Sequence, residues 1–148
     1  MAFRKPVYFE LEEFLDSSTA RQKSIQNSPS WEIVEHLLEL AYFLDDLREA
    51  WGKPVYVSSG FRNEKINKAV GGVATSAHLR GDAADIYVAG GKTAMDKFGE
   101  FLVDYLKDKC FDQLLREKSK SGGYWYHISL KNKDGLQRKQ IKDMFVNR

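Results

Sequence analysis

Three side chains in the sequence have the types and spacing needed to hold a metal ion. His78 and Asp85 share the segment SAHLRGDAAD, and His127 follows in WYHIS. A catalytic zinc ion takes three nitrogen or oxygen ligands and leaves one coordination position for water. Two histidines and one carboxylate would meet that need, and Gly81 would let the backbone turn closely between the first two. The alternative is structural, since a single histidine or a strand aspartate often serves packing, capping or an ion pair.

The elements around these residues are expected to bring them together. Apolar residues recur at helical spacing over 31–51, between the N-cap candidate Ser30 and Gly52, and this pattern predicts a helix. Trp31 and Trp51 are expected in the core rather than in a sugar-binding platform. Further helices are predicted over 62–70, 92–108 and 136–146, and strands over 54–59, 83–88, 111–117 and 124–130. The pattern indicates an α+β fold with a small central antiparallel sheet and flanking helices.

Composition limits the class of protein. The 148 residues are 43% hydrophobic and 30% charged, without an internal repeat or linker, so a single domain over 1–148 is expected. A net charge of +2 without a dense basic stripe argues against a nucleic-acid partner. The single cysteine, Cys110, excludes an intrachain disulfide and a cysteine-rich zinc site. No apolar stretch approaches the ~18 residues of a membrane span, and a monomer is expected.

Three motifs in order, SSGFRNEKINKAVGG, TSAHLRGDAADI and FDQLLRE with WYHIS, resemble the zinc D-Ala-D-Ala carboxypeptidase family. The fold of that family is shared with the Hedgehog signalling domain. The resemblance runs from about Phe9 onward, and the family motif Ser-x-His-x-x-Gly-x-Ala-x-Asp is complete here. It implies that one zinc ion is bound by His78, Asp85 and His127.

The resemblance also implies roles for residues around the metal. Arg62 matches the family arginine that binds the scissile carbonyl or a substrate carboxylate, and Ser76 is a further candidate for substrate contact. Many members carry an acidic residue three positions before the third ligand, where this sequence has Tyr124. If the hairpin turn is centred between residues 120 and 121, Glu117 lies opposite Tyr124, about 5 Å away between Cβ atoms. We therefore predict Glu117 as the general base.

Two alternatives for these hairpin residues stay open. Glu117 could be a solvated charge in a lysine-rich turn. Tyr124 could bind substrate by donating a hydrogen bond to the oxyanion that forms during peptide cleavage. The sequence alone does not choose between these roles and a catalytic Glu117.

By this resemblance, the chain is expected to be a zinc metallopeptidase that cleaves peptide bonds in the stem of bacterial peptidoglycan. It could act as a carboxypeptidase or as an endopeptidase, with metal-activated water as nucleophile. The N-terminal residues lack the apolar run of a signal peptide. We therefore expect synthesis in the cytoplasm and action on the cell wall after release of the phage or prophage endolysin type. The alternative is a zinc-containing module that binds peptidoglycan or peptide without cleaving it.

Overall fold

Five strands form one sheet in the computed structural model, which describes residues 5–142. Their spatial order is β1-β2-β4-β3-β5. The neighbouring pairs are antiparallel except for β3 and β5, which run parallel. The predicted α+β architecture is confirmed. The sheet also contains a fifth strand, which the sequence did not predict and which runs parallel to its neighbour. The strands are β1 (Tyr56–Ser59), β2 (Ala83–Tyr87), β3 (Gln113–Lys118), β4 (Tyr124–Ser129) and β5 (Gln140–Lys142).

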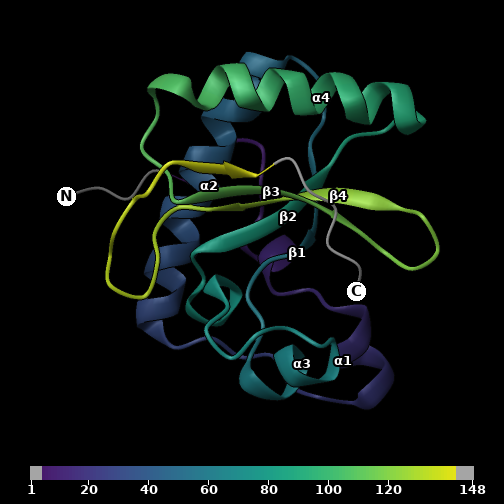
Figure 1. The fold of residues 1–148 in the computed structure, drawn as a ribbon. Coiled ribbons are helices and arrows are strands. Elements are labelled where there is room, and N and C mark those ends of the chain that lie inside the picture. The colour runs from purple at the N-terminus through teal and green to yellow at the C-terminus, as the bar shows by residue number, and fades with distance from the viewer. Residues whose placement is uncertain (1–4, 143–148) are drawn as a thin grey trace.

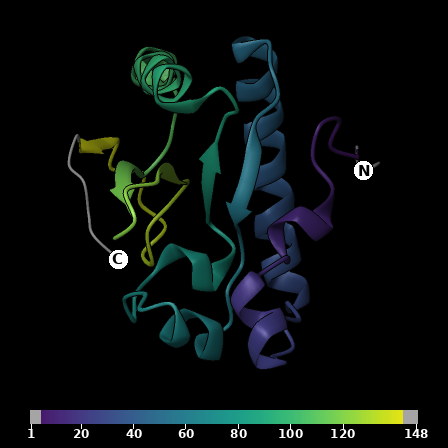
Figure 2. The ribbon, with the colours of Figure 1, turned by 90° about the vertical axis from the view of Figure 1, so that its right-hand side faces the viewer.

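Helical segments lie on both sides of this sheet, with α4 on one side and α1 and α3 on the other (Figure 1). Turned by 90°, the long α2 runs beside β1 (Figure 2). The α-helices are α1 (Ser18–Lys23), α2 (Trp31–Trp51), α3 (Glu64–Ala69) and α4 (Gly91–Tyr105). Short 3-10 turns are η1 (Leu11–Phe14), η2 (Ala77–Arg80) and η3 (Leu106–Asp108). None of the helices within residues 5–142 combines the length and the apolar character needed to cross a membrane.

The core lies between the sheet and the apolar faces of α2 and α4. It includes leucines of α2, Phe98 and Leu102 of α4, and the strand residues Ala84, Ile86 and Ile128. Successive side chains on a strand point to opposite faces. The alternate residues of β2 and β4, which include Asp85 and His127, therefore point away from this core.

Helix α2 begins and ends where the sequence predicts. The Ser30 hydroxyl accepts a hydrogen bond from the Ile33 amide at 3.2 Å, and Gly52 ends the helix with a φ of 82°. Trp51 packs against Phe98 with ring centroids 5.1 Å apart. The prediction that Trp31 lies in the core is wrong: its side chain is 85% exposed. Trp31 is the first helical residue, and Glu35, its neighbour one turn on, is also exposed.

The helix predicted over 136–146 is wrong as far as residue 142. A loop occupies this stretch and leads into β5, while residues 143–146 lie outside the described part of the chain. Arg138 pairs with Asp112 through two hydrogen bonds of 2.8 Å, and the Gln140 amide donates to the Asp112 carbonyl at 2.8 Å. Lys139 has a φ of 54°. Pairing with β3 and the Arg138–Asp112 contact thus outweigh the local preference of this segment for a helix.

Candidate metal centre

The three predicted ligands meet in one buried cluster. His78 comes from η2, Asp85 from β2 and His127 from β4, and one ligand atom of each lies within 4.8 Å of the others. Asp85 Oδ1 is 3.2 Å from His78 Nε2 and 3.0 Å from His127 Nδ1. The two imidazole rings have centroids 5.0 Å apart and planes inclined by 66°. The structure therefore brings together residues separated by up to 49 positions in the sequence.

Strand pairing positions two members of the cluster. In the antiparallel β2–β4 pair, Asp85 lies directly opposite His127. Cross-strand partners have Cβ atoms about 5 Å apart, so their polar atoms converge on the sheet face turned away from α2 and α4. The neighbours of Asp85 along β2, Ala84 and Ile86, are fully buried in the core on the opposite face. Hydrophobic burial of these two residues fixes which way Asp85 points.

His78 is oriented by a backbone carbonyl. Its Nδ1 lies 2.6 Å from the Gly60 oxygen, and a carbonyl only accepts, so Nδ1 carries the proton and Nε2 is left with its lone pair towards Asp85. A Cβ at Gly60 would lie 2.5 Å from the Phe14 carbonyl oxygen, which explains the glycine there. Ser76 caps η2 by accepting a hydrogen bond from the His78 amide at 3.2 Å. Such fixed imidazole orientation is typical of metal-binding histidines.

The electrostatics of the cluster favour the metal-binding protonation states. Burial lowers the pKa of His78 and so keeps its imidazole neutral. Burial alone would raise the pKa of Asp85, but its interactions with His78 and His127 hold that pKa below the usual range. A neutral imidazole and an ionised carboxylate are the forms that bind zinc. Two imidazole nitrogens and one carboxylate oxygen within mutual reach fit the donor set of a catalytic zinc ion.

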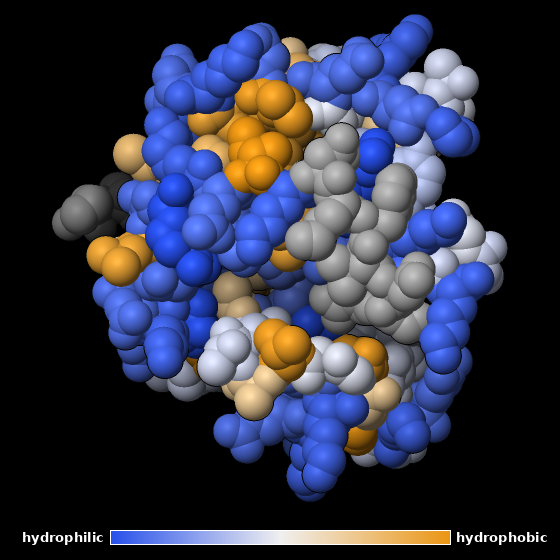
Figure 3. All heavy atoms as spheres, in the orientation of Figure 1, coloured by the Kyte–Doolittle hydropathy of each residue, from blue (hydrophilic) through white to orange (hydrophobic). Residues whose placement is uncertain are grey.

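A groove of about 630 Å³ opens beside the cluster, between the segment 70–80 and the inner face of β3 and β4. Its lining includes Arg62, Ser76, Glu117 and His127. Arg62 is only 5% exposed, and its Nη2 donates a hydrogen bond of 3.4 Å to Ser76 Oγ. The space-filling view shows the surface hollowed between the sheet and the part of the molecule that carries α3 (Figure 3). The groove thus gathers a cation and a carboxylate beside the candidate metal ligands.

Glu117 lies on the same sheet face as His127. The β3–β4 register pairs Glu117 with Trp125 and Leu115 with His127, so Glu117 is a diagonal neighbour of His127, about 7–8 Å away. Its side chain is 2% exposed, and Trp125 Nε1 donates a hydrogen bond to Glu117 Oε2 at 3.1 Å. The alternative of a solvated hairpin charge does not agree with this burial.

The predicted pairing of Glu117 with Tyr124 is wrong by one residue. Tyr124 lies opposite Lys118, because the hairpin loop has three residues rather than two. The Ser119 amide donates to the Gly123 carbonyl at 2.7 Å, and Gly122 between them has a φ of 98°. A left-handed glycine after a tight turn is typical of three-residue hairpin loops. A one-residue shift of register reverses the face of each side chain, so Glu117 and Tyr124 point to opposite sides of the sheet.

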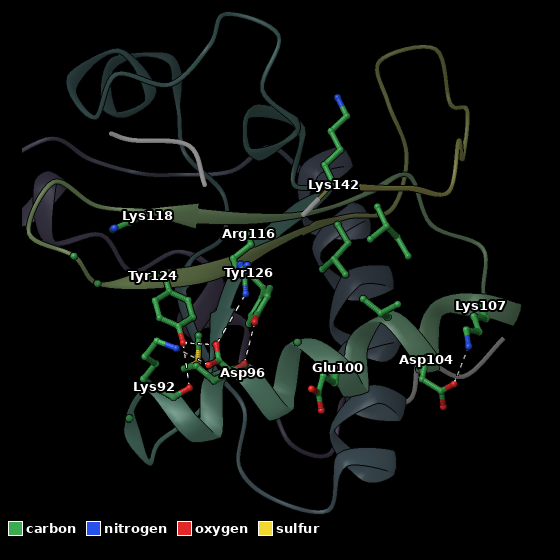
Figure 4. A pocket seen from close by; sticks show the side chains of 18 residues that line it. Lys92, Asp96, Glu100, Asp104, Lys107, Arg116, Lys118, Tyr124, Tyr126 and Lys142 are labelled. Atoms are coloured by element: carbon green, nitrogen blue, oxygen red, sulfur yellow. Dashed lines mark hydrogen bonds and ion pairs between the residues drawn. The ribbon is translucent and has the colours of Figure 1, made fainter. Parts of the chain in front are cut away.

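Tyr124 is therefore not brought to the candidate metal centre. Its side chain points to α4 (Figure 4), where the hydroxyl lies 2.8 Å from Asp96 Oδ1 and 3.1 Å from the Lys92 carbonyl oxygen. Burial and the hydrogen bond to Asp96 raise the pKa of the Tyr124 phenol to about 12. The predicted contact of Tyr124 with substrate is not supported by this placement. Its position on the α4 side indicates a structural role.

Two residues of the site were missed from the sequence. Gly60 orients His78 through its carbonyl, and Trp125 donates to Glu117. Trp125 carried a usable signal, since it stands two positions before His127 on one strand and must share its face. Gly60 carried none, because any residue type supplies a carbonyl.

An α+β fold with a buried His-Asp-His cluster beside a groove has the features of a protein with a catalytic metal site. The chain matches the family model described as Peptidase M15 over residues 7–121, well over half its length, and it belongs to this family. Members of the family are metallopeptidases that in general depend on zinc. The matched range contains His78, Asp85 and Glu117, while His127 lies just beyond it. No curated protein matches the chain.

Proposed function

We propose that this protein is a zinc metallopeptidase that cleaves peptide bonds of bacterial peptidoglycan. The observation that carries the proposal is the buried His-Asp-His donor set, which borders a groove lined by Glu117 and Arg62. His78, Asp85 and His127 would hold one zinc ion. Such an ion, when bound, lowers the pKa of a coordinated water towards ~7 and polarises a carbonyl oxygen.

Glu117 is the general base in this proposal. Its carboxylate is nearly fully buried, lies on the face of the metal ligands, and is oriented by the Trp125 indole N–H. With its orientation fixed by this hydrogen bond, the carboxylate takes a proton from the attacking water. The same group then returns the proton to the leaving amine. General acid–base catalysis of this kind contributes about 10²–10⁴-fold to a rate.

Arg62 stabilises the negative charge that develops on the scissile carbonyl oxygen. Its guanidinium is buried at the groove, where water screens it little, and Ser76 fixes it through a hydrogen bond of 3.4 Å. Loss of one such oxyanion contact costs about 3–4 kcal/mol of transition-state stabilisation. Ser76 is the positioning residue here, because its hydroxyl contacts both Arg62 and the amide of His78.

The test is release of peptide from purified peptidoglycan by zinc-loaded protein, analysed by mass spectrometry beside zinc content. We expect His127→Ala to lose zinc and activity together. Glu117→Gln should keep zinc and release peptide about 10²–10⁴-fold more slowly. Glu100→Gln, which changes an exposed carboxylate on α4, is the matched control and should behave as wild type. Full activity in Glu117→Gln would contradict the proposed base.

The fragments also determine which reaction is catalysed. Release of a single terminal residue identifies a carboxypeptidase, whereas larger peptides identify an endopeptidase. If folded, zinc-loaded wild type binds peptidoglycan and releases nothing from several wall types, the second candidate function stands instead. That candidate is a zinc-containing binding module. It is favoured by Tyr124, which stands where many family members have an acidic residue.

A further inference from the structure

Two tyrosines stack on each other at the surface of the sheet. Tyr56 of β1 and Tyr87 of β2 are cross-strand partners, with ring centroids 5.3 Å apart and planes inclined by only 29°. They are 41% and 39% exposed, among the most exposed large aromatic side chains of the described chain. Exposed apolar surface held in a fixed arrangement often marks a binding site. Neither ring belongs to the core or to the lining of the groove.

The tyrosine pair lies on the face of the candidate metal centre. Tyr87 follows Asp85 by two residues on β2, so both side chains point to the same side, about 7 Å apart along the strand. The β2–β4 register pairs Asp85 with His127 and Ile86 with Tyr126, and one further step sets Tyr87 opposite Trp125. Trp125 in turn pairs with Glu117. An aromatic row thus crosses the sheet directly beside the row of metal ligands.

We propose that Tyr56 and Tyr87 form a stacking platform for a sugar ring of the glycan strand whose attached peptide enters the groove. The proposal rests on the proposed function and deepens it: the substrate is recognised with its sugar, not as peptide alone. The two rings stack on each other, so a sugar ring would extend the stack on an outer face of the pair, with the phenolic hydroxyls at its edge.

A sugar ring fits this surface better than an apolar group. One face of the ring carries C–H bonds polarised by neighbouring oxygens, which are attracted to the negative face of an aromatic ring. Its hydroxyls lie around the edge and remain in water, so stacking does not bury unpaired polar groups. An apolar side chain would gain most from a pocket that encloses it, and here the rings cover only one side.

The direct test measures sugar binding without catalysis. The full chain is titrated with chitotetraose, a linear N-acetylated amino-sugar oligomer, and the tyrosine ring signals are followed by NMR. We expect shifts at Tyr56 and Tyr87 and at least a tenfold weaker affinity in Tyr56→Ala and Tyr87→Ala. Tyr87→Phe keeps the ring and should bind nearly as wild type. Trp31→Ala removes another exposed aromatic side chain and is the matched control.

A cleavage assay separates this proposal from the proposed function. One stem peptide is offered with its disaccharide and without it. We expect wild type to prefer the sugar-linked form in kcat/KM by about tenfold, and Tyr87→Ala to lose this preference while cleaving the free peptide at an unchanged rate. Equal cleavage of both forms, without chitotetraose shifts, would overturn the platform and leave the peptidase intact. Chitotetraose binding without any cleavage would retain the platform and reject the peptidase.

A third outcome identifies peptide as the occupant. If Tyr56→Ala and Tyr87→Ala slow cleavage of the sugar-free peptide as much as that of the sugar-linked form, the rings contact the stem itself. Thermal unfolding of each variant shows whether it is folded. If an alanine variant fails to fold, the chitotetraose titration of the wild-type Tyr56 and Tyr87 ring signals still decides whether sugar binds at the pair.

Discussion

The two faces of the β3–β4 hairpin have different roles: one borders the groove, and the other packs against α4. On the inner face, Glu117, Trp125 and His127 border the groove beside the candidate metal centre. The opposite face is turned towards α4 and is called the outer face. There Tyr124 contacts Asp96 of α4, close to Arg116 (Figure 4). Both faces contain a hydroxyl or a carboxylate able to take part in catalysis. Among residues 5–142, only the inner face has a buried donor set able to bind a metal ion next to such a group.

The difference shows that position along a strand decides a role more strongly than residue type. Tyr124 and Trp125 are adjacent in the sequence, and both are aromatic hydrogen-bond donors. Because side chains alternate, one contacts a helix and the other orients the proposed base. The loop residue Gly122 determines this division, since its left-handed backbone adds the residue that sets the register.

The largest expected effect separates the two faces by activity. Trp125→Phe removes the indole N–H that donates to Glu117 Oε2, a hydrogen bond to a charged group worth about 1.5–3 kcal/mol. We expect peptide release to slow by roughly 10–100-fold with unchanged zinc content. Tyr124→Phe removes a hydroxyl on the outer face and should leave activity nearly unchanged.

These two variants sharpen the comparison in either direction. Equal losses of peptide release in both variants would show that the two faces are not functionally separate. Tyr124 would then again be a candidate for contact with substrate. A changed zinc content in Trp125→Phe would assign the indole to metal binding rather than to orientation of Glu117. Thermal unfolding of each variant distinguishes these outcomes from a loss of folding.

The metal ligands could be predicted because three motifs of the sequence resemble the family, whereas their spacing alone left a structural role open. The helix over 31–51 and the strand after Asp82 follow from short apolar patterns, and Asp85 lies on that strand. The hairpin register could not be predicted with equal ease. A two-residue and a three-residue loop both fit the polar stretch, and the observed three-residue loop has Gly122 in a left-handed conformation.

The C-terminal error has a different physical origin. Residues 136–142 form no helix because contacts with distant residues outweigh local propensity. Asp112, buried at the start of β3, binds Arg138 and accepts from the Gln140 amide. A single sequence gives no sign of such a pairing, since either partner alone is an ordinary surface charge. Long-range ion pairs and the parallel pairing of a further strand are therefore features that could not be predicted from the sequence.

A smaller effect is expected where the register is set. Gly122→Ala places an L side chain at a φ of 98°, and a left-handed conformation costs such a residue about 1–2 kcal/mol. We expect the free energy of unfolding to fall by that amount in urea denaturation. The matched control is Gly123→Ala, whose added Cβ would meet Ser119 Oγ at an ordinary 3.5 Å. If both variants are equally stable, backbone conformation at Gly122 does not hold the register.

The smallest effect concerns the outer face alone and depends on pH. Tyr124→Phe removes a partly buried hydrogen bond to Asp96, which should cost about 1 kcal/mol at pH 8. The folded pKa of Tyr124, about 12, lies above the unfolded value of about 10. Its contribution is thus fully present below pH 10 and is lost as the pH rises towards 12. The stability difference between wild type and Tyr124→Phe should therefore shrink over this window.

Urea denaturation at pH 8 to 11.5 measures that difference. Tyr8 and Tyr105 also have raised pKa values, but both remain in the variant, so subtraction isolates Tyr124. A difference that stays constant with pH would mean that the Asp96 contact does not depend on the protonated phenol. A shrinking difference, together with unaltered cleavage at pH 8, would show that the outer face stabilises the hairpin while the inner face alone serves the groove.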